Sequence, residues 1–321
     1  MAFPLVAVLS AMIACVILGR SAAALVLRMR PRQAVVLVTA AALTVSVAGG
    51  VALTAIAVGV VAGLSSVAAD GHWSAAVIRA ELPIPVWLGV VSAVTVSVLL
   101  LRAVVRTVTI SRAMIRAERL CRELRTGAGP IVIVDDGSAD AYTVAGLRGC
   151  VVIGRRLLLQ LSNEERRILT GHELSHLNNR HHLFVHIADI AVAANPLLGP
   201  VSAAVRLGVE RWADEDAAAA LGDRRRAGRA LARVALLRSS LGTEVPAGSG
   251  SFRGPWSDRT VRTLSVAGSH VVSRVQALLQ PAPQGGIGRL VGVVVLALAV
   301  LATGIASMDY IHEAIEMAAG G

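Results

Sequence analysis

The stretch "GHELSHLNNRHH", residues 171 to 182, decides how this sequence is interpreted, because it holds four of the eight histidines of the chain. His172 and His176 are four positions apart, and on a helix this spacing brings two side chains onto one face about a turn apart. Two imidazoles can therefore be directed at one metal ion. Glu173 is rotated by roughly 100 degrees from His172, so it projects beside such an ion and can accept a proton there. The stretch predicts a catalytic zinc site.

The surrounding sequence predicts one long helix that carries this stretch. Ser162 and Glu165 form a Ser-x-x-Glu pattern, which is typical of a helix start. Asn195-Pro196 should end the helix, because proline disfavours the helical conformation in the residue before it. The other histidines of this helix would lie one to three turns beyond the metal pair, and we interpret them as solvent-facing or membrane-proximal: His181, His182 and His186.

A third metal ligand is expected from a second helix, predicted over about residues 199–221. Glu210 and Asp214 are also four apart, so Glu210 can bind the metal while Asp214 fixes the orientation of a ligating histidine ring. The alternative is an ordinary acidic helix face, since Glu215 and Asp216 follow at once. Beside a helix that carries His-Glu-x-x-His, we favour the interpretation as a metal ligand.

The composition indicates a membrane protein. Of the 321 residues, 55% are hydrophobic and only 16% are charged, and the mean hydropathy is +0.67. Such a balance is unusual for a water-soluble domain. Four apolar stretches are near or above the length that a helix needs to cross the hydrocarbon core: residues 3–19, 34–64, 85–101 and 290–308. We expect a mainly α membrane protein with four transmembrane helices.

A polar block lies between the third and fourth of these stretches. We divide the chain into residues 1–105 with three spans, residues 106–284 as an inserted domain, and residues 285–321 with the fourth span and a short tail. An amphipathic helix over residues 107–125 should continue from the third span, and a helical pattern returns over residues 259–279. Short runs bounded by turn residues predict a small sheet, so the inserted domain is expected to be α+β: residues 130–134, 141–145 and 150–153.

The distribution of charge predicts the orientation in the membrane. All 31 basic residues are arginine, and the formal net charge is +10. Residues 20–33 carry four arginines and no acidic residue, whereas residues 65–84 carry Asp70 and Glu81 against one arginine. Because cytoplasmic loops are the basic ones, both termini should lie outside the cell and the block 106–284 in the cytoplasm. Nucleic acid is not an expected partner, because the arginines are spread along the chain and aromatic residues are only 3%.

The cysteines and the missing lysines exclude other chemistry. A serine site of the Ser-x-x-Lys type cannot form in a chain without lysine. Cys15 lies in the first span, and Cys121 and Cys150 lie in the predicted cytoplasmic block, where thiols stay reduced. We therefore expect no disulfide and no cysteine metal site.

These residues resemble the BlaR/MecR family of integral-membrane zinc metallopeptidases. The resemblance rests on residues 171–177, on Asn195-Pro196, on Glu210-x-x-x-Asp214 about 34 residues beyond His176, and on three spans before and one after the domain. It implies a cytoplasmic gluzincin-type domain that cuts a winged-helix repressor of the BlaI/MecI kind. Family receptors carry a penicillin-binding domain after the fourth span. Here about a dozen residues follow Met308, so a direct antibiotic sensor is not expected.

The expected function is therefore a zinc endopeptidase of the cell membrane that cuts a protein substrate on the cytoplasmic side. His172, His176 and Glu210 would bind zinc, Glu173 would be general base and then proton donor, and Asp214 would support a ligand. The substrate would add as a strand to the edge of the small sheet, an edge that the sequence does not identify.

Two alternatives remain open at this stage. Membrane peptidases of the HtpX and prenyl-protein types share both motifs, which would indicate quality control of membrane proteins. A non-catalytic zinc-binding signalling protein would keep the same residues. A transporter is disfavoured, because four spans without an internal charged residue offer no ion path.

Overall fold

Four long apolar helices form one part of the protein. The structure, a computed structural model, describes residues 2–125, 127, 129–135, 140–243, 271–283 and 285–320. Within these residues, four helices are long and apolar enough to cross a membrane: α1 (Ala2–Arg28), α2 (Pro31–Ala62), α5 (Val86–Leu124) and α12 (Ile287–Gly320). The expectation of four apolar helices is confirmed. On which side of a membrane their ends lie stays a prediction.

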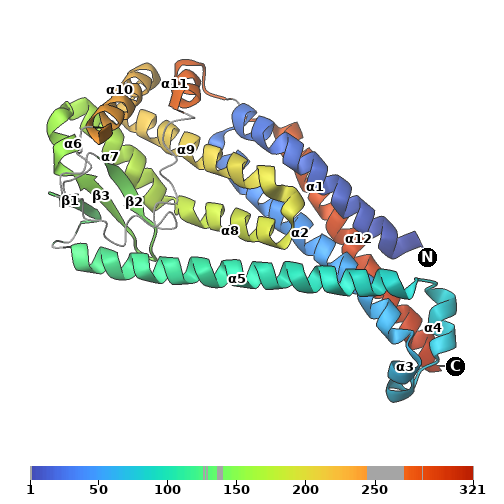
Figure 1. The fold of residues 1–321 in the computed structure, drawn as a ribbon. Helices are drawn as coiled ribbons and strands as arrows, with labels where there is room; N and C mark the ends of the chain where they lie inside the picture. Colours follow the sequence, from blue (N-terminus) through green and yellow to red (C-terminus); the bar gives the residue numbers. More distant parts are fainter. Residues whose placement is uncertain are drawn as a thin grey trace.

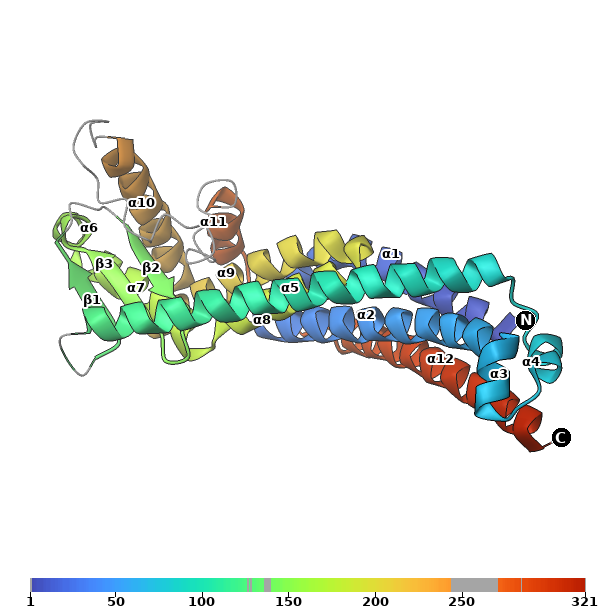
Figure 2. The same cartoon turned by 60° about the horizontal axis from the view of Figure 1, so that its bottom comes forward.

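The helices α1, α2 and α12 pack against one another, and both termini lie at the same end of the molecule (Figures 1 and 2). Small residues line the contact, such as Ala14, Ala22 and Ala42, which allow the helix backbones to approach closely. At the end that holds the termini, the chain between α2 and α5 forms two short helices, α3 (Ser65–Gly71) and α4 (Ala75–Glu81).

The helix α5 runs along nearly the whole molecule and connects the apolar helices to a small sheet (Figure 2). Its first part exposes valines and leucines over many turns, as expected for a surface that faces lipid. Its last turns pack on the sheet through Ala117 and Cys121. The predicted continuation of the third span into an amphipathic helix is therefore confirmed, and the two form one unbroken element.

The sheet has three strands: β1 (Ile131–Val134), β2 (Ala141–Val144) and β3 (Cys150–Gly154). The order is β1-β3-β2, with β1 parallel to β3 and β2 antiparallel to β3. All three strands were predicted from short runs bounded by turns, and they are confirmed. The central strand β3 is buried along its whole length, so β1 and β2 are the edges among the described strands.

A disulfide joins α5 to the sheet and corrects one expectation. Cys121 and Cys150 are bonded, with their Cα atoms 5.7 Å apart. The expectation that both cysteines are free thiols is wrong in the structure. Sequence spacing gave no sign of the pair, because the two residues meet only when the end of α5 packs over the start of β3. Glu118 strengthens the same junction, since its carboxylate accepts hydrogen bonds from the backbone N–H groups of Arg148 (2.9 Å) and Gly149 (3.3 Å).

A second correction concerns the helix that carries the histidines. The expected single helix is two, α7 (Asn163–Asn178) and α8 (His181–Ala194). Between them Arg180 adopts a left-handed conformation with φ of 51°. This residue turns the chain, so that α8 leaves α7 in a new direction. The capping box of Ser162 and Glu165 that starts α7 is confirmed.

The remaining helices complete the part of the molecule around the sheet. They are α6 (Arg155–Gln160), the 3₁₀ turn η1 (Pro196–Leu198), α9 (Gly199–Leu221), α10 (Arg224–Thr243) and α11 (Val271–Leu279). The predicted helix over residues 199–221 is confirmed and ends at Gly222, whose φ of 76° is left-handed. Of the helical pattern over residues 259–279, the structure describes α11, and the preceding residues lie outside the described part.

The hairpin made of α8, η1 and α9 packs alongside α1 and α2 (Figure 1). Its residues Ala188, Ala191, Val201 and Val205 belong to the same buried apolar cluster as the small residues of α1 and α2. The apolar helices and the α8–α9 hairpin therefore share one continuous core. The division at residues 105 and 284 remains a prediction about the chain.

Candidate metal centre

Three side chains from two helices converge at one point. His172 and His176 project from α7, and Glu210 projects from α9. The Nε2 atoms of the two histidines lie 3.1 Å apart. Glu210 Oε2 lies 3.6 Å from His172 Nε2, and Glu210 Oε1 lies 3.5 Å from His176 Nε2. The structure thus brings together the three predicted ligands, across the packed contact between α7 and α9.

The spacing of these atoms fits a zinc ion. Ligand atoms at about 2.1 Å from a tetrahedral zinc stand roughly 3.4 Å from one another. The three measured separations, 3.1, 3.5 and 3.6 Å, lie around that value. Two imidazole nitrogens and a carboxylate oxygen are also a donor set typical of catalytic zinc. The residues present therefore fit a zinc ion in donor type and in approximate spacing.

Asp214 lies behind His172, one turn beyond Glu210 on α9. Its Oδ1 atom is 3.0 Å from Nδ1 of His172, within hydrogen-bonding distance, and the carboxylate is buried. This contact fixes the imidazole with Nε2 turned toward the other ligands. Burial acts to lower the pKa of His172, but the contacts to Asp214 and Glu210 outweigh it and raise the pKa to about 9. Burial lowers the pKa of His176, although the nearby Glu210 carboxylate acts to raise it.

Arg274 of α11 completes the cluster, and sequence reasoning missed it. Its guanidinium donates to Glu210 Oε2 (2.8 Å) and, through two nitrogens, to Asp214 (2.6 and 2.7 Å). Burial alone would raise the pKa of Glu210, but Arg274 and the histidines hold it below its usual range. No local sequence pattern distinguishes Arg274 from the other arginines among the 31 in the chain, because it lies sixty positions after its partner Asp214.

The charges of the centre suit a divalent cation. Glu173, Glu210 and Asp214 are three carboxylates, and Arg274 is the cation among the described residues that ion-pairs with this group. A bound metal requires both histidines to be neutral, and in that state two negative charges are left uncompensated by side chains. Buried charges of one sign are costly, so a doubly charged cation bound at this point would stabilise the group.

Glu173 is held beside the ligands by the sheet. The hydroxyl of Thr143 on β2 lies 2.9 Å from the carboxylate oxygen Oε2 of Glu173 and 2.9 Å from its main-chain oxygen. Both side chains are buried. The sequence indicated Thr143 only as a residue of a short strand. Its role as a partner of Glu173 depends on how β2 packs against α7, which no local pattern reveals.

The three remaining histidines of the predicted helix do not face solvent, so the solvent-facing interpretation is wrong, while the membrane-proximal interpretation stays a prediction. His181, His182 and His186 are all buried. Because the chain turns at Arg180, His181 folds back and its Nδ1 lies 2.9 Å from Nδ1 of His176. Its ring also lies against Trp212, with centroids 4.5 Å apart. His181 therefore supports His176 from behind, much as Asp214 supports His172.

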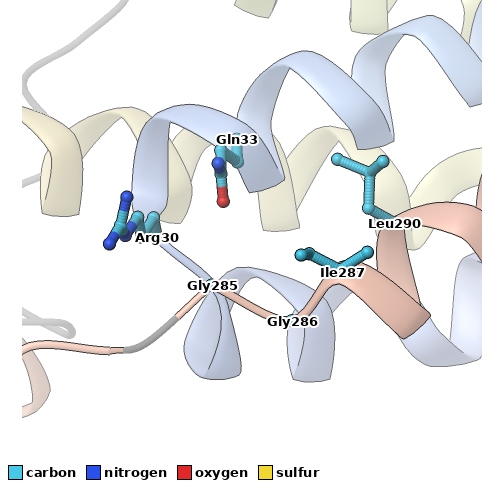
Figure 3. Close-up of a pocket in the computed structure, with 6 residues that line it drawn as sticks. All are labelled: Arg30, Gln33, Gly285, Gly286, Ile287 and Leu290. Atoms are coloured by element: carbon cyan, nitrogen blue, oxygen red, sulfur yellow. The ribbon is translucent and has the colours of Figure 1, made fainter.

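A pocket elsewhere in the molecule does not add to this centre. A cavity of about 260 Å³ opens where the chain enters α2 and α12, and Figure 3 shows the six side chains and backbone segments around it: Arg30, Gln33, Gly285, Gly286, Ile287 and Leu290. No histidine or carboxylate lines it. Its chemistry is that of a crevice between helix ends.

Comparison with protein families supports the chemistry of the centre. Residues 112–207 match Peptidase family M48, which indicates a metallopeptidase hydrolase. The matched segment contains Thr143, His172, Glu173 and His176, and it ends before Glu210. Peptidases of this family usually use zinc. A search of curated proteins and a search of solved structures each found no match.

Proposed function

We propose that this protein is a membrane-embedded, zinc-dependent endopeptidase. The observation that carries the proposal is the convergence of His172, His176 and Glu210 from two helices. Glu173 lies beside these three candidate ligands and is not one of them, so its carboxylate is free to act as a base. Three protein ligands with room for a fourth are typical of catalytic zinc, whereas structural zinc is enclosed by four. The match of residues 112–207 to a metallopeptidase family supports the same reaction class.

Each residue of the centre has a distinct part in peptide hydrolysis. A zinc ion bound at the three ligands supplies a Lewis acid that polarises the scissile carbonyl and activates water. Glu173 takes a proton from the attacking water and passes it to the departing amine. Thr143 holds the Glu173 carboxylate in position, and Asp214 and His181 keep the two imidazoles oriented.

The substrate is proposed to lie along β2. This strand pairs with β3 on one side only among the described strands, and it carries Thr143, which contacts Glu173. A peptide that adds to this edge as a further strand would present its backbone next to the general base. In this binding mode, main-chain hydrogen bonds would supply most of the affinity for the substrate, and side chains would contribute less.

The cytoplasmic orientation is also a proposal. The arginines of residues 20–33 support it, because the loops on the cytoplasmic side of a membrane are the basic ones. The Cys121–Cys150 disulfide weighs against it, because disulfides are rare in reducing compartments. We favour the charge argument, since it rests on several residues.

The proposed substrate is a winged-helix repressor of the BlaI/MecI kind, by resemblance of the motifs to BlaR/MecR peptidases. A second candidate is the HtpX-like cleavage of membrane proteins. One observation favours the second candidate: the α8–α9 hairpin packs directly against α1 and α2, so the centre lies close to the apolar helices.

The test is Glu173→Gln in the full-length protein, with Glu164→Gln as control, because Glu164 is an exposed acid on the same helix. Glu173→Gln should keep bound zinc and lose proteolysis by about two to four orders of magnitude, the usual contribution of a general base. Both variants are compared with wild type by mapping newly formed protein N-termini in cells and by cleavage of purified repressors. Unchanged cleavage by Glu173→Gln would refute the proposal, and zinc binding without any cleavage by wild type would favour the signalling alternative.

A further inference from the structure

We propose that the α8–η1–α9 hairpin is a membrane anchor: it dips into the bilayer from the side of the metal centre, turns within the lipid and returns without crossing. Its partner is the acyl and glycerol region of the bilayer. The proposal concerns where the hairpin lies, so it stands whether or not the centre cleaves peptides.

The tip of the hairpin touches α1 near the end of its apolar stretch and α2 well inside its apolar length. Asn195 donates a hydrogen bond to the thiol of Cys15 (3.0 Å), and Ser46 donates to the main-chain oxygen of Ala191 (3.1 Å). A Cβ on Gly19 would lie 3.6 Å from the main-chain oxygen of Leu197. Cys15 and Ser46 lie more than three turns from the basic residues Arg28 and Arg32, whereas Gly19 is next to Arg20.

The helix α5 provides a scale for depth. Trp87 near its start is 66% exposed, and tryptophan is enriched at membrane–water interfaces. From Trp87 to Arg106, at about 1.5 Å per residue, the helix rises roughly 29 Å, close to the thickness of the hydrocarbon core. Between these two residues α5 exposes a continuous series of apolar side chains, interrupted by Arg102. Arg106 therefore marks the lipid–water boundary on the side of the metal centre.

The hairpin extends past that boundary. Arg106 pairs with Asp189 (2.5 Å), and one turn deeper Arg102 donates to the main-chain oxygen of Ala193 (3.2 Å). The tip at Asn195 to Leu198 follows Ala193 and lies deeper still. Counting turns of α5, the tip is about 6 to 10 Å on the lipid side of Arg106. This depth is the one that interfacial helices reach, and it is far short of a crossing.

The chemistry of the hairpin agrees with this environment. Residues 190–205 contain no charged residue. Asp189, the acid next to this segment, is compensated by Arg106, by Arg206 (2.8 Å) and by the hydroxyl of Ser202 (2.6 Å). The carbonyl of Ala193 at the end of α8 would be orphaned in lipid, and it accepts a bond from Arg102. The carbonyl of Ala191 already accepts from the N–H of Asn195 (2.8 Å), and Ser46 adds a second bond to it. At the tip, apolar Leu197 is 49% exposed.

An anchor of this kind sets the height of the metal centre. Glu210 follows Pro200 by ten residues, which is about 15 Å along α9. With the tip at about 6 to 10 Å below the boundary, the centre lies within roughly one or two turns of the lipid surface. If the proposed peptidase activity holds, the enzyme would act on peptide bonds close to the membrane.

The test measures depth directly with a nitroxide spin label on the full-length protein in vesicles of phosphatidylcholine and phosphatidylglycerol. The parent carries Cys15→Ser, because Cys15 is the free cysteine among the described residues. Single cysteines are then introduced at Leu197, at Ile305 of α12 and at Leu159 of α6. Ile305 is a matched lipid control at 51% exposure, and Leu159 is a water control at 70% exposure. Collision of each label with oxygen, which enters lipid, is compared with collision with a water-soluble nickel chelate.

The ratio of oxygen to nickel collisions at Leu197→Cys should resemble that at Ile305→Cys and exceed that at Leu159→Cys several-fold. Ile187→Cys on α8, two residues from Asp189, should give an intermediate ratio because it lies nearer the boundary. A ratio at Leu197→Cys equal to that at Leu159→Cys would overturn the proposal, since the tip would then face water. Shielding from both reagents would also overturn it, since protein would then cover the tip. Zinc binding by each labelled variant checks that the hairpin is folded.

Discussion

At the scale of single residues, each histidine of the centre has its own supporting partner, and the partners come from different parts of the chain. His172 is held by Asp214 of the neighbouring helix, and His176 by His181 beyond the turn. Such contacts fix the tautomer and direction of an imidazole before a metal arrives. The residues that orient the two imidazoles therefore lie on α8 and α9, although both histidines lie on α7.

Thr143→Val should slow catalysis without releasing zinc. Valine has nearly the shape of threonine but cannot donate to the Glu173 carboxylate, and a hydrogen bond to a charged group contributes about 1.5 to 3 kcal/mol. We expect kcat to fall about tenfold or more, with KM and zinc content unchanged. Thr143→Ser, which restores a hydroxyl, should recover most of the rate. Equal kcat for Thr143→Val and wild type would mean that the contact does not position the base.

Arg274→Gln should destabilise the protein, most of all without zinc. The substitution leaves the partly buried Glu210 and the buried Asp214 without their cation, and breaking a buried ion pair costs about 3 to 5 kcal/mol. Bound zinc should offset part of this loss because it supplies positive charge at Glu210. Thermal unfolding with and without zinc measures both effects, and Arg226→Gln, an exposed pair on α10, is the control. A loss that zinc does not reduce would contradict the electrostatic account.

The candidate ligands could be picked out from sequence, whereas the side chains that contact them could not. His172, His176 and the pair Glu210 and Asp214 follow helical spacing, which is a local property that a sequence displays. Thr143 and Arg274 approach from a strand and from a distant helix, so their positions depend on packing between elements. His181 could be seen in sequence, but its direction depended on a turn that was not expected.

At the scale of elements, that turn explains the main error in the predicted fold. The pair Asn179-Arg180 contains neither glycine nor proline, so it gives little sign of a helix end. Arginine rarely adopts the left-handed conformation found at Arg180, so the sequence gives no local reason to expect the turn there. The strands, by contrast, were predictable because turn residues bound each of them, although their order was not.

Gly149→Ala should destabilise the sheet more than Gly222→Ala destabilises α9. Both glycines have left-handed φ, which costs another residue about 1 to 2 kcal/mol. At Gly222 an added Cβ meets nothing within 4 Å, whereas at Gly149 it would lie 2.7 Å from the main-chain oxygen of Val144 and 2.6 Å from Leu177. Denaturation of each variant gives the difference, which isolates the steric cost. Equal losses would mean that the loop before β3 relaxes freely.

At the scale of the whole molecule, the apolar helices and the metal centre form a single packed unit. The helix α5 joins them on one side, through the disulfide and Glu118, and the α8–α9 hairpin joins them on another. A displacement of the apolar helices would therefore also move β2, which pairs with β3, the strand that carries Cys150 of the disulfide. Composition predicted the four spans, but it could not predict this sharing of one core, because residues 190–205 are too short an apolar stretch to be counted as a span.

The orientation of the unit can be tested with an impermeant maleimide on intact cells, in the Cys15→Ser background. If the arginine distribution decides the orientation, Met317→Cys at the end of α12 is labelled from outside, and Leu159→Cys of α6 is labelled only after lysis. Both positions are exposed, at 55% and 70%, so access is limited by the membrane alone. The opposite pattern would put the metal centre outside the cell.

A second alkylation experiment, on the native cysteines, tests whether the disulfide persists in the cell. Cys121 and Cys150 are both fully buried in the core between α5 and the sheet. A thiol such as glutathione must reach a sulfur atom to reduce the bond, so burial protects it kinetically even in a reducing compartment. We therefore expect Cys121 and Cys150 to resist alkylation in folded protein from cells, and to react only after denaturation with reductant. Alkylation after denaturation alone would mean that the cysteines are thiols in the cell and that the junction of α5 with the sheet depends on Glu118 and packing.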